Sequence, residues 1–393
     1  MSNTLILGGG FGGLACARAL RAKLPPTHHI SLLDRGADFT VGAAKPWVML
    51  GERQPRQASQ RRAALLPQGV ELLRTDVLAI DPRTREVRTS AGSRTPDHLV
   101  IALGAEHDMA AVPGLAEATH TFYSLDGAVR LREALAAFAG GRIVLLIPRL
   151  PFSCPPGPYE GTILLHAALT ERGLRAKTAL EIWTVEKSPM GTAGPEMGKS
   201  IVGLLTERDI GFHPLHRAVS VDGAARTIRF ENGTETTYDL LIAIPPHRAP
   251  RVVVEAGLAE AGGWVTVDPA TFEVKAAGSA PHVYAIGDVT AVPLPGRWDP
   301  AMSLALPKAG IFAAAHGETV AGRIAAAVLG GEPGPAFEGK GHCFIELGSR
   351  RAIRAEGDFF AIPHPVMGAL PPNEAQYHEK VAWIEGLLKE VTE

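Results

Sequence analysis

The N-terminal part of the chain alternates apolar, strand-like runs with a helical pattern. Thr4–Leu7 and His29–Leu33 are mostly apolar and strand-like, and Leu14–Ala22 between them has the pattern of a helix. This order predicts a strand, a helix and a second strand that together form a βαβ unit. Three later segments continue the strand pattern: Val70–Asp81, Glu86–Thr89 and His98–Leu103. We expect them to join a sheet that helices cover on both faces.

A second unit of the same kind begins near Gly141. The apolar run RIVLLIP predicts a strand, residues 162–172 predict a helix, and ALEIWTV at 179–185 predicts another strand. Residues 218–244 alternate as in a hairpin, with Asn232-Gly233 as the turn signal.

Pro245-Pro246 then returns the chain to the first unit, which residues 283–286 and a helix after Pro307 complete. We therefore expect an α/β fold with two Rossmann-like, dinucleotide-binding domains. The first domain is predicted to be discontinuous, with residues 1–115 and 245–330. The second spans residues 116–244, and a C-terminal region spans residues 331–393.

Apolar residues recur at helical spacing near the C-terminus, after Pro371-Pro372. The stripe consists of Tyr377, Val381, Ile384, Leu387, Leu388 and Val391. It predicts a helix that packs against the protein or forms a homo-oligomer contact, and a helix on a membrane surface is the alternative.

Composition and charge exclude several classes of function. The chain has 393 residues, with 39 Lys and Arg against 41 Asp and Glu, a net charge of −2. Without a basic surface run we expect no nucleic-acid partner. The three cysteines and 14 histidines lack metal-ligand spacing, so we expect no metal site. With no signal-peptide pattern and no run long enough to span a membrane, we expect a cytoplasmic protein, with peripheral membrane contact left open.

The turn after the first strand carries a dinucleotide-binding motif. Gly8, Gly10 and Gly13 form GxGxxG between strand and helix, and Asp34 ends the second strand. Gly8 permits the tight turn, Gly10 lets the backbone approach a pyrophosphate, and Gly13 permits close helix packing. Asp34 can accept hydrogen bonds from ribose hydroxyls. The motif alone does not distinguish FAD from NAD.

Two later turns extend this pattern: LVIALGA, which contains Gly104, and VYAIGDVT, which contains Gly287 and Asp288. Their order after GxGxxG resembles the two-dinucleotide-fold flavoproteins of the pyridine nucleotide-disulfide oxidoreductase superfamily. The resemblance implies FAD as cofactor, with Gly287 and Asp288 at its ribityl and phosphate groups and Val77 near its adenine. The other residues expected around the FAD are Phe11, Arg35, Lys45, Ala102, Lys308 and Gly310, besides the glycines and Asp34 named above.

The second unit lacks its own glycine motif. After the strand the sequence reads PRLPFSCPPGPYEG, so prolines stand where a phosphate-binding turn would be expected. Proline removes N–H donors and fixes φ, so we expect this domain not to bind a nicotinamide dinucleotide.

The segment CPPGPYE at 154–160 is similar to the motif of the sulfide:quinone oxidoreductase and flavocytochrome c sulfide dehydrogenase branch. AKPWVMLG, YDLLIAIPPHRAP, GWVTVD and LPKAG extend the resemblance through most of the chain. It implies that Cys154 and Cys343 lie on one face of the flavin and pass electrons from sulfide to it, with Glu160 as an acid or base. Two-electron oxidation of sulfide through a cysteine pair and a carboxylate is chemically consistent with this.

The sequence also bears on the electron acceptor. Exported sulfide dehydrogenases of the branch have a flavin-linking cysteine near position 42, where this chain has Gly42 and Ala43, so we expect noncovalent FAD. Quinone is the expected acceptor, with Phe344, Phe359, Phe360, Pro363 and Met367 as pocket candidates. A cytochrome as acceptor, an NADH dehydrogenase-like flavoprotein and a non-catalytic flavin redox sensor are the alternatives.

Overall fold

A five-stranded parallel sheet forms the first domain, with β1 (Asn3–Leu7) at its centre. The computed structural model describes residues 2–259, 263–301 and 303–391. The strands run in the order β20 (Val283–Ala285), β9 (His98–Ile101), β1, β2 (His29–Leu33) and β5 (Val70–Leu73). Ile6, Leu32 and Val100 are fully buried, as expected for strands covered on both faces.

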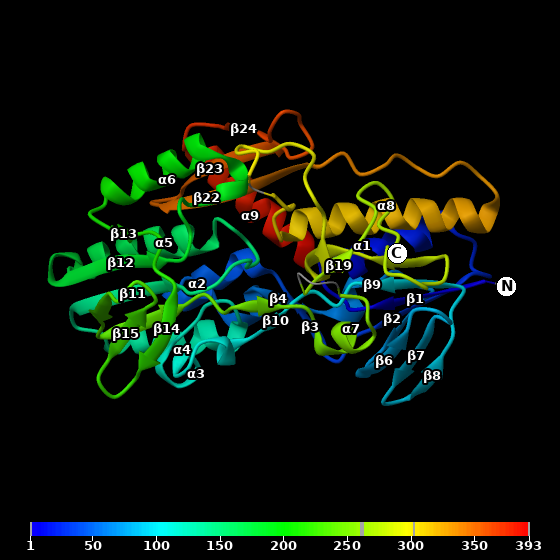
Figure 1. The fold of residues 1–393 in the computed structure, drawn as a ribbon, viewed down its shortest axis with the longest axis horizontal. Helices are drawn as coiled ribbons and strands as arrows, with labels where there is room; N and C mark the ends of the chain where they lie inside the picture. The colour runs from blue at the N-terminus through cyan, green and yellow to red at the C-terminus, as the bar shows by residue number, and fades with distance from the viewer. Residues whose placement is uncertain (1, 260–262, 302, 392–393) are drawn as a thin grey trace.

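Two helices cross closely on this sheet. α1 (Phe11–Lys23) follows the glycine turn and packs against α8 (Gly310–Leu329), which runs along one face of the domain (Figure 1). A Cβ on Gly317 would lie 2.4 Å from the carbonyl oxygen of Gly12 and 2.9 Å from the nitrogen of Cys16. Glycine at 317 therefore permits the crossing, and Cys16 is a fully buried packing residue.

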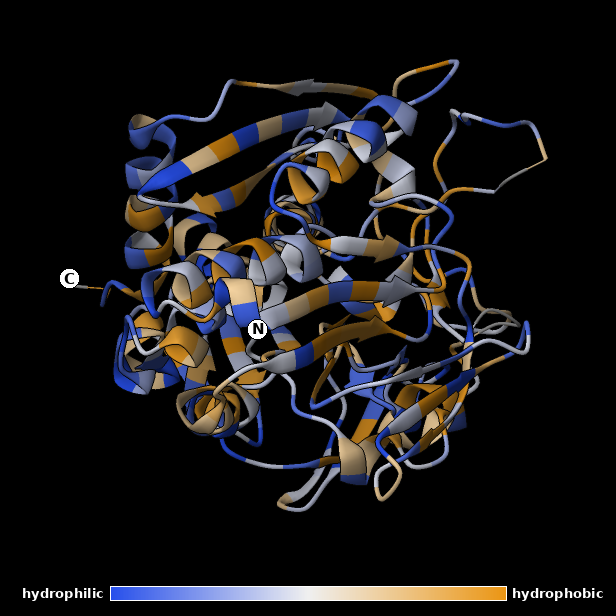
Figure 2. Cartoon of the chain, turned by 90° about the vertical axis from the view of Figure 1, so that its left-hand side faces the viewer, coloured by the Kyte–Doolittle hydropathy of each residue, from blue (hydrophilic) through white to orange (hydrophobic). Residues whose placement is uncertain are grey.

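The second domain is built on a four-stranded parallel sheet. Its order is β13 (Gly211–His213), β12 (Thr178–Thr184), β11 (Gly141–Ile147) and β17 (Leu240–Ala243). Its helices are α3 (Leu115–Ala118), α4 (Leu125–Ala137), α5 (Gly157–Glu171) and α6 (Pro195–Thr206). Both sheets confirm the α/β fold, and their strands carry much of the apolar sequence (Figure 2).

The predicted turn at Asn232-Gly233 is confirmed. β14 (Ala218–Asp222), β15 (Thr227–Phe230) and β16 (Glu235–Thr237) form an antiparallel sheet, and Gly233 has a φ of 82° between the last two. Glycine adopts this left-handed conformation without a Cβ penalty.

Two predicted boundaries were wrong. Val70–Asp81 is not one strand: β5 ends at Leu73, and β6 (Val77–Asp81) pairs antiparallel with β7 (Glu86–Thr89) in a separate sheet with β8 (Gly92–Arg94). The polar residues between them allow the turn, where Thr75 and Ser90 hydroxyls lie 2.8 Å apart.

The helix expected over 162–172 begins earlier, at Gly157. Pro156 is its N-cap residue and Pro158 lies in its first turn. Proline is tolerated there because the first N–H groups of a helix have no intrahelical partner. The prolines therefore start this helix rather than delay it, and Glu160 lies on its first turn.

The C-terminal region covers both domains. β22 (Lys340–Gly348), β23 (Arg351–Asp358) and β24 (Val366–Ala369) form an antiparallel sheet, against which α9 (Glu374–Leu388) packs. Ile384 is fully buried, which confirms the packing interpretation of this helix. In Figure 1 the sheet lies across the top of the molecule and α9 lies beneath it.

Short elements complete the described part of the chain. They are β3 (Asp38–Thr40), α2 (Lys45–Leu50), β4 (Ser59–Arg61), β10 (Glu106–His107), β18 (His247–Arg248), α7 (Arg251–Glu255), β19 (Val265–Thr266) and β21 (Thr290–Ala291). β10 and β18 pair antiparallel, so the two connections between the domains run side by side. Within the described residues, no helix is both long and apolar enough to cross a membrane.

Three histidines cluster at the amino ends of the first sheet. The rings of His98 and His282 are 4.8 Å apart, those of His28 and His98 are 6.4 Å apart, and His28 Nε2 lies 2.9 Å from the Thr4 hydroxyl. His28 is 2% exposed and His98 is 5% exposed. Burial, with the neighbouring histidines, lowers the pKa of His98 to about 4.

We predict that this cluster makes the fold acid-sensitive. The unfolded chain binds a proton at His98 near pH 6.5 and the folded chain only near pH 4, so stability is full above pH 6.5 and falls between these values. From pH 7 to pH 5 the free energy of unfolding should fall by about 2 kcal/mol through His98 alone. Urea unfolding of His98→Gln should show a smaller pH dependence. Exposed His378→Gln is the control, and an unchanged dependence in His98→Gln would contradict the assignment.

Candidate active site

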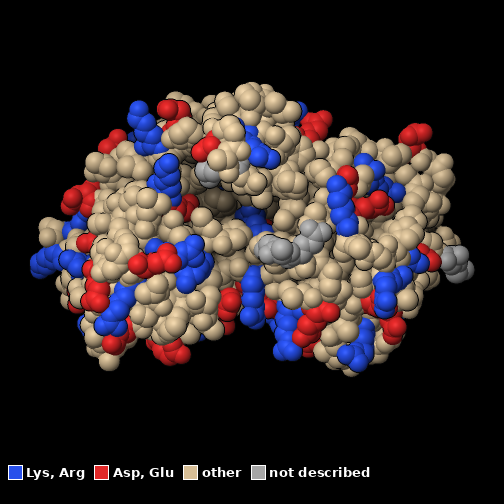
Figure 3. Space-filling model, in the orientation of Figure 1, with Lys and Arg blue, Asp and Glu red and all other residues tan. Residues whose placement is uncertain are grey.

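A cavity of about 1100 Å³ lies where the two domains and the C-terminal region meet. A hollow opens on the face seen in Figure 3, where charges of both signs are scattered. Most of the predicted site residues line the cavity: Gly10, Phe11, Lys45, Ala102, Gly104, Cys154, Glu160, Gly287, Asp288, Lys308, Gly310 and Cys343. The fold thus brings together segments from all three parts of the chain.

The remaining predicted residues lie outside this lining. Gly8 and Gly13 shape the turn: Gly8 has a φ of 102°, and a Cβ on Gly13 would lie 1.9 Å from the carbonyl oxygen of Gly8. Val77 begins β6, and Arg35 is exposed. Their expected contacts with FAD stay predictions.

Asp34 stabilises the glycine turn through hydrogen bonds. Its carboxylate accepts hydrogen bonds from the backbone N–H groups of Gly9, at 2.7 Å, and Gly36, at 2.8 Å. Arg62, which sequence reasoning missed, lies 3.3 Å from the same carboxylate and donates to the carbonyl oxygen of Gly9 at 2.8 Å. This buried guanidinium gives the turn a second support.

The residues present fit a dinucleotide cofactor. Helix α1 begins at the cavity, and a Cβ added to Gly10 would meet nothing within 4 Å, so the helix N-terminus faces open space. Such an N-terminus favours a pyrophosphate. Asp288 lies in the same cavity, where burial raises its pKa and Lys308 opposes this. The cavity also exceeds the roughly 300–1,000 Å³ of ordinary ligand pockets.

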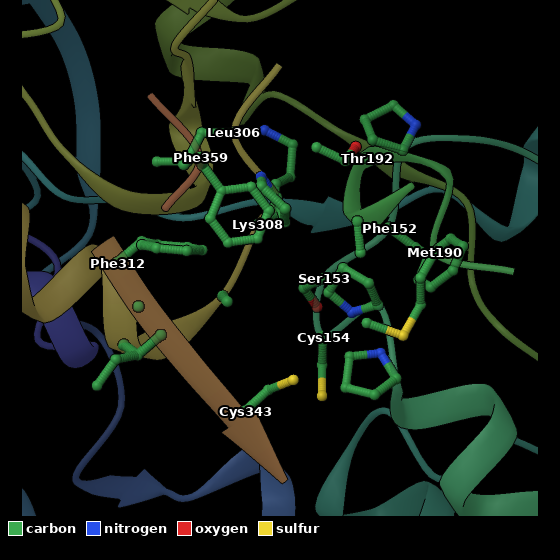
Figure 4. A pocket seen from close by; sticks show the side chains of 18 of the residues that line it. Phe152, Ser153, Cys154, Met190, Thr192, Leu306, Lys308, Phe312, Cys343 and Phe359 are labelled. Atoms are coloured by element: carbon green, nitrogen blue, oxygen red, sulfur yellow. The ribbon is translucent and has the colours of Figure 1, made fainter. Parts of the chain in front are cut away.

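The two cysteines that line the cavity come from distant segments. Cys154 precedes α5 and Cys343 lies on β22, and both are free thiols whose side chains approach one another in Figure 4. Burial, with the charge of Glu160, raises the pKa of Cys154 to about 11. Burial, with the charges of Cys154 and Glu160, raises the pKa of Cys343 to about 12. Both thiols are therefore protonated at neutral pH and need a proton acceptor to react.

Cys154 has an unusual backbone conformation. Its φ is +56°, in the left-handed region that non-glycine residues seldom adopt. Its N–H donates to the carbonyl oxygen of Lys308 at 2.7 Å, and its own carbonyl accepts from the N–H of Gly157 at 2.8 Å. These bonds hold the strained residue in place, a pattern typical of functional sites.

A buried cluster of charges lies beside the cysteines. Lys380 Nζ donates to Glu160 Oε1 at 3.0 Å and to Glu346 Oε2 at 2.7 Å, and the N–H of Glu346 donates to Glu160 Oε2 at 2.9 Å. The Trp47 indole N–H also donates to Glu346, at 2.9 Å. Lys380, Glu160 and Glu346 are 1%, 5% and 3% exposed.

Burial within this cluster favours a proton on Glu160. Burial raises its pKa, and Glu346 adds to this although Lys380 opposes it. Burial lowers the pKa of Lys380, but the two carboxylates outweigh this and the net shift is upward. With two carboxylates and one ammonium, a proton on Glu160 neutralises the cluster. Sequence reasoning missed Lys380 and Glu346; the signal for Lys380 was a lysine on the apolar stripe of a helix.

Two more lysines line the cavity. Lys45 donates to the carbonyl oxygen of Tyr123, and burial lowers its pKa to about 8 although Cys154 opposes the shift. Lys308 donates to the carbonyl oxygens of Asp288, at 2.7 Å, and Thr290, at 3.0 Å, and burial lowers its pKa to about 8. Within the described residues, no cluster of His, Cys, Asp and Glu could hold a metal ion.

Comparisons with known proteins found two matching family models and several relatives. One family model, pyridine nucleotide-disulphide oxidoreductase, matches residues 2–146, and another, the central part of the sulfide dehydrogenase (flavocytochrome c) flavoprotein chain, matches residues 128–245. The mitochondrial sulfide:quinone oxidoreductase of Mus musculus is 24% identical over 371 residues, 91% of this chain and 78% of the relative. The sulfide-quinone reductase of Aquifex aeolicus is 27% identical over 301 residues, 74% of this chain and 69% of the relative.

A solved structure shares the fold. The sulfide:quinone oxidoreductase of Aquifex aeolicus superposes with a TM-score of 0.84 at 23% identity, covering 98% of this chain and 90% of that one. The protein is therefore an FAD-dependent oxidoreductase with the fold of the pyridine nucleotide-disulphide oxidoreductases. Its central part and its full-length relatives are similar to the sulfide:quinone oxidoreductases and the flavocytochrome c sulfide dehydrogenase flavoproteins.

We predict that Lys380→Met destabilises the fold, because it leaves two buried carboxylates unpaired. The free energy of unfolding should fall by about 3–5 kcal/mol. Adding Glu346→Gln to Lys380→Met should recover part of the loss. In the control Arg229→Met, which breaks an exposed ion pair of 2.8 Å, the loss should stay below about 1 kcal/mol. Equal losses in Lys380→Met and Arg229→Met, measured by urea unfolding, would contradict the prediction.

Proposed function

We propose that the protein oxidises sulfide to sulfane sulfur through Cys154 and Cys343 and delivers the electrons, by way of noncovalently bound FAD, to a quinone. The observation that carries this proposal is that two free cysteines share one cavity with the FAD-site residues and a buried carboxylate. The names of the mouse and Aquifex relatives support sulfide as donor and quinone as acceptor.

The cysteine pair reacts as a disulfide. Hydrosulfide forms a bond with one cysteine sulfur, the Cys154–Cys343 bond breaks, and the other cysteine leaves as a thiolate with the electron pair. The hydrosulfide proton leaves to a base. A second hydrosulfide then takes the outer sulfur of the persulfide as HSS⁻, which leaves both cysteines as thiolates. FAD, when bound, would accept the two electrons released as these thiolates rejoin as a disulfide and would pass them to the quinone.

The buried cluster prepares the cysteines for this cycle. Glu160 lies in the cavity and contributes to the raised pKa of both thiols. Because burial raises the pKa of Glu160, this carboxyl group is a better proton acceptor than an exposed carboxylate and is suited to exchange protons with the thiols. Lys380 and the N–H of Glu346 fix its two oxygens, so Glu160 is held in one orientation.

The second domain is unsuited to NADH. Glu186 follows β12, where a Rossmann fold places the carboxylate that binds a ribose. Here it is 7% exposed and accepts hydrogen bonds from the hydroxyls of Tyr159 and Thr184. Together with the proline-rich turn, this disfavours the NADH dehydrogenase alternative.

A quinone from a membrane would reach the cavity beside an apolar edge. Phe344, Phe359 and Met367 line the cavity, whereas Phe360 and Pro363 lie outside its lining. Ile362, Val366 and Leu370 are 77%, 57% and 50% exposed, and no Lys, Arg, Asp or Glu occurs between Asp358 and Glu374. An exposed apolar segment of this kind suits contact with lipid. We therefore place the membrane contact at residues 362–370 rather than on α9.

Sulfide titration of the purified, FAD-loaded protein without oxygen tests the proposed reaction. Sulfide should bleach the flavin absorbance and a soluble quinone should restore it. Cys154→Ser and Cys343→Ser should slow the bleaching by at least about 10²-fold, because each removes one sulfur of the pair. Cys16→Ala is the matched control and should bleach as the wild type does. Bleaching by NADH but not by sulfide would refute the proposal, and bleaching that a cytochrome but not quinone reverses would refute the acceptor.

Vesicle sedimentation tests the membrane contact. Changing Ile362, Val366 and Leu370 to Ser should reduce binding to lipid vesicles, because each removes exposed apolar area. Activity with a lipid-embedded quinone should fall with it, and activity with a water-soluble quinone should not. Leu215→Ser removes a similarly exposed leucine from the second domain, 62% exposed, and serves as control. Equal vesicle binding by both variants would contradict this placement.

A further inference from the structure

A serine and a histidine beside the cysteines form a hydrogen-bonded pair. Ser153 Oγ lies 3.1 Å from His247 Nε2, and His247 Nδ1 lies 2.7 Å from the carbonyl oxygen of Pro245. A carbonyl only accepts hydrogen bonds, so Nδ1 carries the proton. Nε2 of the neutral ring is then an acceptor, and the Ser153 hydroxyl donates to it.

This pair leads from the cavity toward solvent. Ser153 lines the cavity and directly precedes Cys154, and both side chains appear in the close view of Figure 4. The His247 ring packs against Tyr123, at 5.9 Å between centroids, and against His107, at 5.0 Å. His107 is exposed. The order from inside to outside is therefore Ser153, His247, His107.

We propose that Ser153 and His247 carry away the proton that sulfide oxidation releases at the cysteine pair. The inference rests on the proposed function. When the sulfur of hydrosulfide bonds to a cysteine and the other cysteine leaves as thiolate, one S–H proton remains to be removed. Ser153 Oγ accepts this proton while its own proton passes to His247 Nε2. The imidazolium formed then loses a proton to solvent on the side of His107.

The surroundings of His247 suit a transient proton carrier. Burial lowers its pKa to about 4, and His107 on β10 together with Lys308 and Lys45 adds to the shift. Tyr123 is the other titratable group whose ring contacts it, and burial raises the pKa of that phenol, so it stays neutral. At neutral pH His247 is thus unprotonated and free to accept, and the two lysines favour onward release.

Glu160 does not make this path redundant. Its two oxygens are bound by Lys380 and by the N–H of Glu346, and every member of that cluster is at most 5% exposed. The cluster can hold a proton for the thiols, but its members are themselves buried from solvent. The Ser153–His247 pair supplies the route by which the proton reaches solvent.

The chain offers a matched control. His216 has the same local geometry as His247: its Nδ1 lies 2.7 Å from the carbonyl oxygen of Pro214, two residues earlier. It packs against Trp183 and Phe230 in the second domain and is outside the cavity lining. His216→Gln therefore reproduces the structural change of His247→Gln without touching the cavity.

The experiment measures sulfide-driven flavin reduction by stopped flow without oxygen, in the FAD-loaded full chain, at several concentrations of imidazole buffer. His247→Gln can keep both hydrogen bonds but cannot carry a proton, so its rate should fall about 10²-fold. The rate should then rise with imidazole concentration, as an external base replaces the lost one. Ser153→Ala should behave alike, and Ser153→Thr, which keeps the hydroxyl, should recover most of the rate. His216→Gln should match the wild type and show no buffer dependence.

The proposed proton transfer through Ser153 and His247 would be overturned if His247→Gln and Ser153→Ala reduced the flavin as fast as His216→Gln, at rates independent of the buffer. The proposed function would stay intact. If flavin reduction is slow in His247→Gln and imidazole does not accelerate it, His247 has a structural role, and the proposed proton transfer is also overturned. A wild-type flavin that sulfide does not reduce would remove the proposed function and this inference with it.

Discussion

One buried ammonium group holds together the segments that carry the two cysteines. Lys380 of α9 binds Glu160 at 3.0 Å, six residues after Cys154, and Glu346 at 2.7 Å, three residues after Cys343. Charges this deeply buried are stable only when paired, so α5, β22 and α9 must meet at this point. The C-terminal helix therefore helps to build the cavity that the two cysteines line.

Backbone hydrogen bonds hold Cys154 from the side of the first domain. Cys154 is held at a φ of +56° between the carbonyl of Lys308 and the N–H of Gly157, so the FAD-binding domain fixes the thiol as well. Burial keeps both thiols protonated, and groups able to accept their protons lie on two sides: Glu160 within the protein and Ser153 with His247 toward solvent.

Much of the fold and part of the site followed from local sequence. The glycine turn, the order of strands and the turn at Asn232-Gly233 depend on residues close together in the chain, so their patterns were readable. The motif CPPGPYE placed Cys154 and Glu160 on one segment, and the resemblance it carries added Cys343. The comparisons support that branch.

The long-range contacts of the site could not be predicted from local sequence patterns. Lys380 and Glu346 meet Glu160 only after the chain has folded. A lysine on the apolar stripe of a helix marks Lys380 as unusual, but its spacing in sequence does not identify its partners. Arg62 was missed for the same reason, since its partners at the glycine turn are far away in the chain. The start of one helix was also predicted too late, at residue 162 instead of Gly157. Proline is compatible with the first turn of a helix, because the N–H groups there have no intrahelical partner.

The most direct measurement is a peptide map, under non-reducing conditions, of the protein after oxidation by excess quinone. We predict that Cys154 and Cys343 are linked to each other, directly or through added sulfur atoms, and that Cys16 stays a free thiol. Finding Cys154 and Cys343 both as free thiols after repeated turnover with sulfide and quinone would contradict it.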